Sequence, residues 1–224
     1  NITITVQSAG SSSFTVFINN NYVTPPDAGS PTSDIYVASP TFTWTDTTAA
    51  EWFNLKIEDN LNYPIFDQWY QKGVGVSCPA NDCSVIIDTA LPDGDYEWYI
   101  RSWKTVGGLS SWDGPTAFAI VDAELTSPNN TALTNPTAPT FVWNEISVPG
   151  VEWYKLLVTG PSSYQYSEWF EASICTADVC TAFPDIILPA NGNYTWYVQG
   201  WGPEGYGAWS DPASFTLDVG LPNI

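Results

Sequence analysis

Apolar and polar residues alternate in short runs along most of this chain. In the run from residue 95 to 101, Tyr96, Trp98 and Ile100 share one side, and the residues between them share the other. A period of two is typical of a β-strand with one buried face, and we find no apolar pattern that favours a helix. The pattern predicts an all-β protein with strands at 41–45, 52–58, 65–70, 84–88, 95–103 and 116–121, and at 140–144, 153–159, 167–171, 182–187, 193–201 and 214–219.

The same pattern occurs twice. The segment PTFTW at 40–44 recurs as PTFVW at 139–143, and GDYEWY at 94–99 recurs as GNYTWY at 192–197. All 12 tryptophans fall into matched pairs with an offset of about 100 residues, which is the size of one β-sandwich. We therefore predict two tandem sandwich domains preceded by an N-terminal β arm or hairpin, with boundaries at 1–25, 26–122 and 123–224.

One segment of each repeat carries a more specific signal. LPDGDY at 91–96 leads into a long predicted strand, and LPANGNY at 188–194 leads into its counterpart. Both resemble the tyrosine corner of fibronectin type III domains, so the resemblance implies that the hydroxyls of Tyr96 and Tyr194 tie the turn before the penultimate strand. The resemblance extends over about residues 31–219 and implies two fibronectin type III-like (immunoglobulin-like) sandwiches used for adhesion, spacing or surface assembly.

The four cysteines form two pairs with the same spacing. Cys78 and Cys83 in the first repeat correspond to Cys175 and Cys180 in the second. The spacing favours one local disulfide in each repeat over a zinc site, which would need all four cysteines together because the chain has no histidine. Disulfides indicate an oxidising compartment. The pairs also resemble a disulfide-containing variant of the family from bacterial or archaeal secreted and surface proteins.

Composition narrows the function. The chain has 24 acidic and 5 basic residues, and its net charge of −19 disfavours nucleic acid and anionic lipid as partners. No apolar run is long enough to span a membrane. The chain starts without methionine, so we expect an extracellular or cell-surface protein whose signal peptide has been removed, or a fragment.

Catalytic chemistry is not expected. The absence of histidine excludes Ser-His-Asp, Cys-His and His-metal sites, and no pair of carboxylates stands out from the scattered acids. We predict no enzyme activity, no cofactor and no metal site.

The aromatic residues allow two interpretations. Tryptophan rings can stack on sugars, but tryptophans that recur in both repeats also suit core and inter-strand packing, which we favour. The best candidates for exposure and sugar stacking lie at strand ends or outside the alternating core set, and they are Trp69, Trp103, Trp169 and Trp201.

Residues 1–25 have no counterpart before the second repeat. Their apolar residues alternate in two short runs, which are Ile2, Ile4 and Val6, and then Phe14, Val16 and Ile18. This segment is either a hairpin that caps the first sandwich or an assembly arm that adds a strand to a neighbouring subunit. Both repeats have a predicted final strand of their own, so such an arm would extend an existing sheet edge.

Three Asn-x-Ser/Thr sites, at Asn1, Asn129 and Asn193, match the glycosylation pattern, although such matches also arise by chance in a chain rich in Asn and Thr. We take Asn129 and Asn193 as the candidates. Together these observations favour a non-catalytic extracellular structural protein that self-associates into a surface appendage or filament. The alternative is an adhesin module of a larger secreted protein that binds a polysaccharide or another surface.

Overall fold

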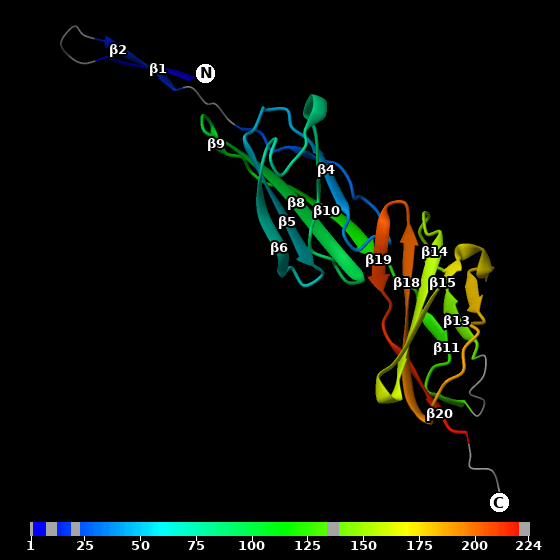
Figure 1. Cartoon of the computed structure of the whole chain (residues 1–224). Coiled ribbons are helices and arrows are strands. Elements are labelled where there is room, and N and C mark those ends of the chain that lie inside the picture. The colour runs from blue at the N-terminus through cyan, green and yellow to red at the C-terminus, as the bar shows by residue number, and fades with distance from the viewer. Residues whose placement is uncertain (1, 8–12, 19–22, 134–138, 220–224) are drawn as a thin grey trace, which may run out of the picture. The chain divides into compact units, whose positions relative to one another are not determined.

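The computed structural model describes residues 2–7, 13–18, 23–133 and 139–219, with side chains described from residue 23 onward. The described residues form strands joined by turns, with 3-10 turns η1 (Pro79–Asn81), η2 (Pro161–Ser163) and η3 (Ala172–Ile174) as their helical elements. The all-β prediction is therefore confirmed (Figure 1). Within these ranges, no helix has the length and hydropathy needed to cross a bilayer.

The first repeat forms two sheets. One contains β10, β8, β5 and β6 in that order, with β9 paired to β8, and the other contains β3, β4 and β7. The final strand β10 also receives a parallel bridge from Ile35 to Ile120. The strands are β3 (Asp27–Ala28), β4 (Thr41–Thr45), β5 (Trp52–Asp59), β6 (Pro64–Gln71), β7 (Asp82–Ile86), β8 (Gly94–Lys104), β9 (Gly108–Leu109) and β10 (Asp113–Ile120).

The second repeat has the same arrangement with more strand pairing. One sheet has the order β12, β20, β18, β14 and β15, with β19 paired to β18, and the other has the order β11, β13, β17 and β16. Strands β12 and β20 pair in parallel, as Ile35 and Ile120 do in the first repeat. The strands are β11 (Leu125–Ser127), β12 (Thr131–Leu133), β13 (Phe141–Asn144), β14 (Trp153–Gly160), β15 (Tyr164–Glu171), β16 (Cys175–Thr176), β17 (Val179–Ala182), β18 (Gly192–Gly202), β19 (Gly205–Trp209) and β20 (Ala213–Leu217).

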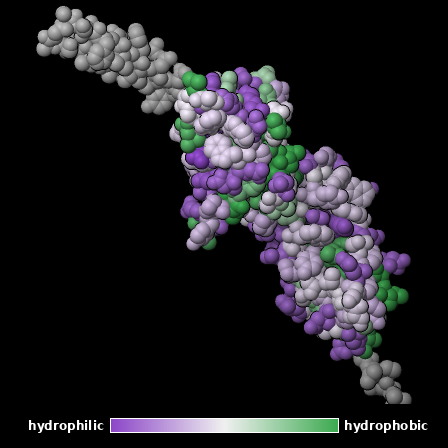
Figure 2. Space-filling view, turned by 60° about the vertical axis from the view of Figure 1, so that its left-hand side comes forward, coloured by the Kyte–Doolittle hydropathy of each residue, from purple (hydrophilic) through white to green (hydrophobic). Residues whose placement is uncertain are grey.

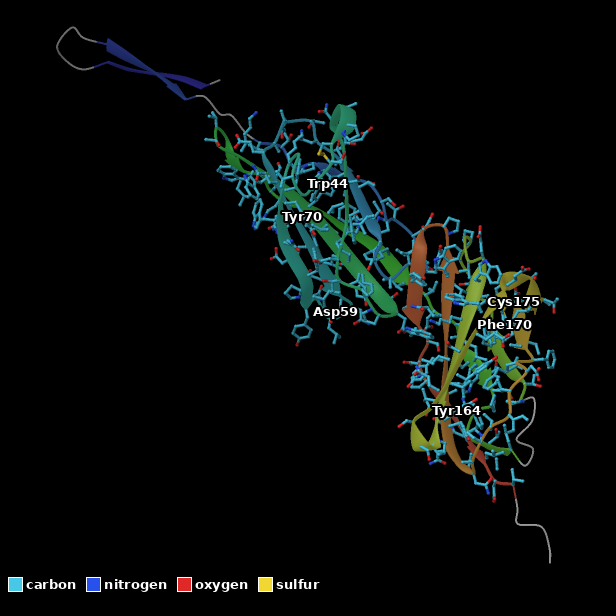
Figure 3. The ribbon with its side chains drawn as sticks, in the orientation of Figure 1. Trp44, Asp59, Tyr70, Tyr164, Phe170 and Cys175 are labelled. Atoms are coloured by element: carbon cyan, nitrogen blue, oxygen red, sulfur yellow. A yellow bond between two sulfur atoms is a disulfide. The ribbon has the colours of Figure 1, made fainter. Side chains whose placement is uncertain are left out.

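The alternating pattern decides which side chains fill each core. Along β8, Tyr96, Trp98 and Ile100 are buried while their neighbours are more exposed, and β18 repeats this alternation. Trp44 lies in the core of the first repeat, where its ring centroid is 5.1 Å from that of Phe53 (Figure 3). Large rings thus occupy matched core positions in both repeats, and fully burying one such side chain stabilises by roughly 2 kcal/mol.

One predicted strand is wrong in its position. The sequence pattern predicts a strand at 182–187, but β17 spans Val179–Ala182. Cys180 is tied to Cys175 and lies directly opposite it in the ladder, so pairing is established earlier in the chain. The ladder ends at Ala182, and Pro184, which has no N–H to donate, prevents it from continuing. In the same way, the strand predicted at 84–88 is β7, which starts at Asp82 and ends at Ile86.

Contacts between Cα atoms group the chain into two compact units. Unit 1 contains Asn1–Ser30, Phe42–Val85 and Glu97–Thr116, and unit 2 contains Pro31–Thr41, Ile86–Tyr96 and Ala117–Ile224. Unit 2 therefore holds the second repeat together with three segments of the first. The domain boundaries expected from the sequence repeat, at 25/26 and 122/123, stay predictions.

Candidate functional site

The 12 tryptophans divide into two groups with different surroundings. Four are almost fully buried in the cores, and these are Trp44, Trp98, Trp143 and Trp196. The other eight are half-buried or exposed. Seven of them lie on the solvent side of the larger sheet of their repeat, and Trp112 lies just before β10, with its ring over Arg101 on that side. The eight are Trp52, Trp69, Trp103 and Trp112 in the first repeat, and Trp153, Trp169, Trp201 and Trp209 in the second. We call these two surfaces the aromatic faces.

Cations alternate with rings on the aromatic face of the first repeat. The guanidinium carbon of Arg101 lies 4.2 Å from the ring centroid of Trp112 and 5.3 Å from that of Trp69. The Lys56 ammonium lies 4.1 Å from the centroid of Tyr99 and 5.2 Å from that of Trp112. Each such contact stabilises by about 0.5–1 kcal/mol at an exposed site. Since Trp112 contacts both cations, we call Arg101, Lys56 and the three rings together the cation–ring ladder.

Polar groups beneath the ladder fix its cations. Arg101 donates from Nε and Nη2 to the buried Asn54 Oδ1, at 3.0 and 2.8 Å, and Asn54 donates to Asp67 at 2.6 Å. Lys56 pairs with Glu58 at 2.7 Å. The Tyr99 hydroxyl donates to Glu97 at 3.0 Å, and desolvation together with that carboxylate raises the pKa of Tyr99 to about 12. The face is therefore held in one arrangement by its own charges.

The aromatic face of the second repeat contains fewer charges. Gln199 occupies the position of Arg101, and its amide donates to the Gly207 carbonyl at 3.0 Å. Lys155 lies 5.5 Å from the ring centroid of Trp169, and that ring lies 6.2 Å from the ring of Tyr206. Trp169 and Tyr206 are both exposed. This face leaves more aromatic surface available to a ligand than the first.

The four tryptophans named as sugar-stacking candidates fall into two pairs. Trp69 and Trp169 are exposed, on β6 and β15, whereas Trp103 and Trp201 are half-buried on β8 and β18. Trp103 lies opposite Leu109 in the ladder, and Trp201 lies opposite Tyr206. The sequence analysis missed two exposed aromatic residues of β19, Tyr206 and Trp209. The alternation of β18 does not extend to this short hairpin strand, so the pattern gave no signal for it.

The structure forms a disulfide at each cysteine pair. Cys78 is bonded to Cys83 and Cys175 to Cys180, with Cα–Cα distances of 3.9 and 3.8 Å, and no cysteine is free. Each bond closes a turn directly before the strand on which the second cysteine of the pair is buried. Closing so short a loop stabilises by roughly 2 kcal/mol in the chain-entropy account.

The tyrosine-corner residues make the contacts that the resemblance implies. The Tyr96 hydroxyl donates to the Pro92 carbonyl at 3.0 Å, and the Tyr194 hydroxyl donates to the Ala190 carbonyl at 2.7 Å. The Tyr194 ring also stacks on Phe215 of β20, at a centroid distance of 5.3 Å. The corner therefore ties the turn, the penultimate strand and the final strand together.

The predicted arm residues lie in two paired strands. Strands β1 (Ile2–Gln7) and β2 (Ser13–Ile18) form a two-stranded antiparallel sheet. Its register sets the apolar residues of the two runs opposite each other as Ile2↔Ile18, Ile4↔Val16 and Val6↔Phe14. The turn at 8–12 and the connection at 19–22 lie outside the described residues.

The two glycosylation candidates are both exposed. Asn129 lies in the turn between β11 and β12. Asn193 lies on β18, where its side-chain oxygen accepts a hydrogen bond from the Thr216 hydroxyl at 2.9 Å. Glycosylation of either residue stays a prediction.

Comparison with known proteins finds similarity in structure only. No family model matches the chain, and no curated protein matches its sequence. Similar solved structures include the FN1–FN3 domains of chicken CNTN1, with 12% identity over 96% of this chain and 76% of that one, and a TM-score of 0.33. A tetra-tandem repeat in the extending region of a large adhesion protein is 13% identical over 93% of this chain and 53% of that one, with a TM-score of 0.35.

A third similar structure contains the fibronectin(III)-like modules of Clostridium thermocellum CbhA, with 13% identity over 87% of this chain and 93% of that one, and a TM-score of 0.30. Because these TM-scores are below 0.5, the fold assignment rests on this chain's own strand order and hydrogen bonds. The parallel pairing of the final strand and the two tyrosine corners lead to one conclusion: the two repeats are fibronectin type III-like β-sandwiches.

Proposed function

We propose that this chain is a structural subunit of an extracellular assembly, in which the N-terminal hairpin of one copy adds a strand to a sheet edge of the next. The observation that carries the proposal is the hairpin itself. Strands β1 and β2 pair with each other as a sheet of their own, with apolar residues in three opposing pairs. A lone two-stranded hairpin is marginally stable in water, so a further strand or a packed surface would stabilise it.

The disulfides support an extracellular role. Each repeat has one, and disulfides persist in oxidising compartments.

The strand order bears on how the hairpin would add to a neighbouring copy. Both sandwiches already contain their final strands, β10 and β20, so the hairpin would extend an edge rather than replace a missing strand. Strands β6 and β15 each lie at one end of the larger sheet of their repeat, and we propose them as the edges for this addition.

The test compares the full chain with a chain that begins at Pro25, by sedimentation velocity and negative-stain microscopy. We expect the full chain to assemble with rising concentration and the shorter chain to stay a folded monomer. Filaments formed by the shorter chain would contradict the arm. A shorter chain that is monomeric but unfolds at lower denaturant concentration would instead support a hairpin that caps its own sandwich.

A second candidate function rests on the aromatic face of the second repeat. Trp169 and Tyr206 are exposed neighbours on this face, and their rings are large enough to stack on sugar units. Quenching of tryptophan fluorescence by a soluble polysaccharide, lost in Trp169→Ala but retained in Trp69→Ala, would support this candidate. Equal quenching of both variants would argue against it.

A further inference from the structure

The second repeat keeps an aromatic pair that contacts cations in the first repeat. Trp112 packs edge to face on Tyr99 in the first repeat, with ring centroids 6.3 Å apart and an interplanar angle of 73°. Trp209 packs on Tyr197 in the second repeat in the same way, at 6.4 Å and 81°. The repeat alignment matches Trp112 with Trp209 and Tyr99 with Tyr197. The two repeats therefore build the same ring geometry at equivalent positions.

The cations of this pair are replaced in the second repeat. In the first repeat, the Arg101 guanidinium and the Lys56 ammonium lie 4.2 and 5.2 Å from the ring centroid of Trp112. The alignment matches Arg101 with Gln199 and Lys56 with Leu157. The second repeat therefore retains the rings, but neutral side chains stand where the first repeat has its cations.

A cavity opens beside Trp209. Its volume is about 720 Å³, and its walls include both Gln199 and Trp209. All of its lining residues belong to unit 2. The Gln199 amide donates to the Gly207 carbonyl at 3.0 Å, so its polar end is held by the backbone of β19. The ring and the residue that replaces its cation therefore both border open space.

The charge of the cavity favours a cation. Of the described residues that line it, Glu204 is the one with a charged side chain, and it is exposed in the turn between β18 and β19. The chain as a whole has a net charge of −19. A negative surface attracts cations and repels anions. An anionic ligand is therefore disfavoured at this site.

The other walls of the cavity are mainly aromatic and apolar. Tyr206 and Trp209 are 56% and 37% exposed, and the wall opposite in sequence contains Pro92 and Ile86, which is 66% exposed. Exposed apolar residues form separate green patches among hydrophilic ones (Figure 2), so such a wall is a local feature of the surface. Aliphatic stems pack on apolar walls, and cations stack on rings. The walls therefore suit a side chain that combines an aliphatic stem with a cation.

We propose that this cavity binds an arginine side chain of a partner protein, with the guanidinium over Trp209 and paired with Glu204. A guanidinium packs on an aromatic ring, as Arg101 does on Trp112, and its planar fork also pairs with a carboxylate. The partner is a different protein, because Arg101 is the single arginine of this chain and already donates to Asn54. The site goes beyond the proposed assembly, since it requires neither the N-terminal hairpin nor sugar stacking.

The test is fluorine NMR of the full chain labelled with 5-fluorotryptophan, titrated with the peptide acetyl-Gly-Arg-Gly-amide at millimolar concentration. The control peptide contains citrulline instead of arginine, because citrulline has a similar shape without the charge. We expect the arginine peptide to shift the Trp209 signal, which is identified by its loss in Trp209→Phe. It should bind about tenfold more tightly than the citrulline peptide, which lacks the ring contact of a cation and the ion pair. No shift, or equal binding of both peptides, would overturn the proposal.

Three variants separate this site from general charge attraction. Glu204→Gln removes the charge of the cavity, whereas Glu145→Gln removes another exposed carboxylate of the second repeat outside the lining. We expect Glu204→Gln to weaken binding about threefold and Glu145→Gln to weaken it much less, and equal weakening would contradict the site. Gln199→Arg supplies a cation from the chain itself and should abolish the shift, so undiminished binding by this variant would also contradict it.

A last measurement distinguishes the arginine site from sugar binding. The same labelled chain is titrated with cellohexaose. A shift of the Trp209 signal with cellohexaose but not with the arginine peptide would overturn this proposal and support the second candidate function. A shift with the arginine peptide alone would support the proposal and leave the sugar platform without support.

Discussion

The two repeats share their cores but differ on their aromatic faces. Phe42 and Trp98 of the first core lie 5.2 Å apart edge to face, and Phe141 and Trp196 of the second core lie 5.0 Å apart in the same way. On the aromatic faces, Arg101 is replaced by Gln199. The cores are constrained by packing at fixed volume, whereas a sheet face open to water tolerates different solutions.

The difference shows how a very acidic chain uses its few cations. Of its five basic residues, four are in the first repeat, and two of these form the ladder with the rings. The first face therefore uses its rings to hold its own charges. The second face has one cation near a ring, so it is the better candidate for an external ligand.

The two repeats also differ in how they close the turn that follows β4 in the first repeat and β13 in the second. After β4, the Asp46 carboxylate is buried, accepts N–H groups from Thr48 and Ala50 at 3.0 Å, and pairs with Lys72 at 2.8 Å. In the second repeat the same turn contains Ile146, whose N–H donates to the Tyr154 hydroxyl at 3.1 Å. One repeat closes this turn with a partly buried ion pair, and the other closes it with a neutral hydrogen bond.

The largest expected effect comes from breaking that ion pair. Burial by itself would raise the pKa of Asp46, but the hydrogen bonds from Lys72 and Thr48 outweigh it and lower the pKa. Lys72→Met leaves a buried carboxylate without its cation and should lower the free energy of unfolding by about 3 kcal/mol. Hydrogen exchange resolved by peptide should show faster opening in the first repeat only. Asp46→Asn combined with Lys72→Met should recover part of the loss, and equal loss in both variants would contradict the ion-pair account.

A smaller effect is expected from making the faces alike. Arg101→Gln gives the first repeat the residue found in the second, and removes two hydrogen bonds to Asn54 and two ring contacts. We expect a loss of about 2 kcal/mol in unfolding free energy. Chemical denaturation followed by tryptophan fluorescence measures it. Gln199→Arg is the matched control, because Lys155 stands at the position of Asn54 and lies opposite residue 199 in the ladder, so the new guanidinium would lack the Asn54 hydrogen bonds. A comparable gain there would show that ring stacking alone suffices.

The tyrosine corners should respond alike in both repeats. Tyr96→Phe and Tyr194→Phe each remove one hydrogen bond to a backbone carbonyl and leave the ring in place. Each should cost about 1 kcal/mol in its own repeat. Unchanged denaturation midpoints in both variants would show that the corners do not stabilise these sandwiches.

The smallest effect depends on pH. Burial, with the nearby Asp93 and Asp211 carboxylates, raises the pKa of Asp122 to about 6, while its counterpart in the second repeat is Val219. A raised carboxyl pKa stabilises the fold below pH 4, and this contribution is lost as the pH rises through about 6. Asp122→Asn should therefore stabilise unit 2 at pH 7 by at most about 1 kcal/mol, because the group is half-exposed. Thermal unfolding at pH 4 and pH 7 tests it, and a gain equal at both would contradict the titration.

The sequence by itself determined the features that depend on near neighbours. Alternation in 95–101 predicted which residues of β8 are buried, because side chains on a strand alternate between faces. The partners in each cysteine pair are five residues apart, so their spacing was informative. The tyrosine corners join residues four apart, and the resemblance to fibronectin type III domains implied them. The position of β17 was missed because a disulfide and a proline overrode the local apolar pattern.

The tertiary structure alone decided which tryptophan rings contact cations and which apolar side chains are exposed. Arg101 meets Trp69 and Trp112 only because β6, β8 and the segment before β10 come together across the sheet. Phe183 and Ile187 are apolar residues on the exposed side of the segment after β17, where they alternate with the buried Ala182, Pro184, Ile186 and Leu188. Such contacts join residues far apart in the chain, where a pattern with a period of two carries no information about the partner.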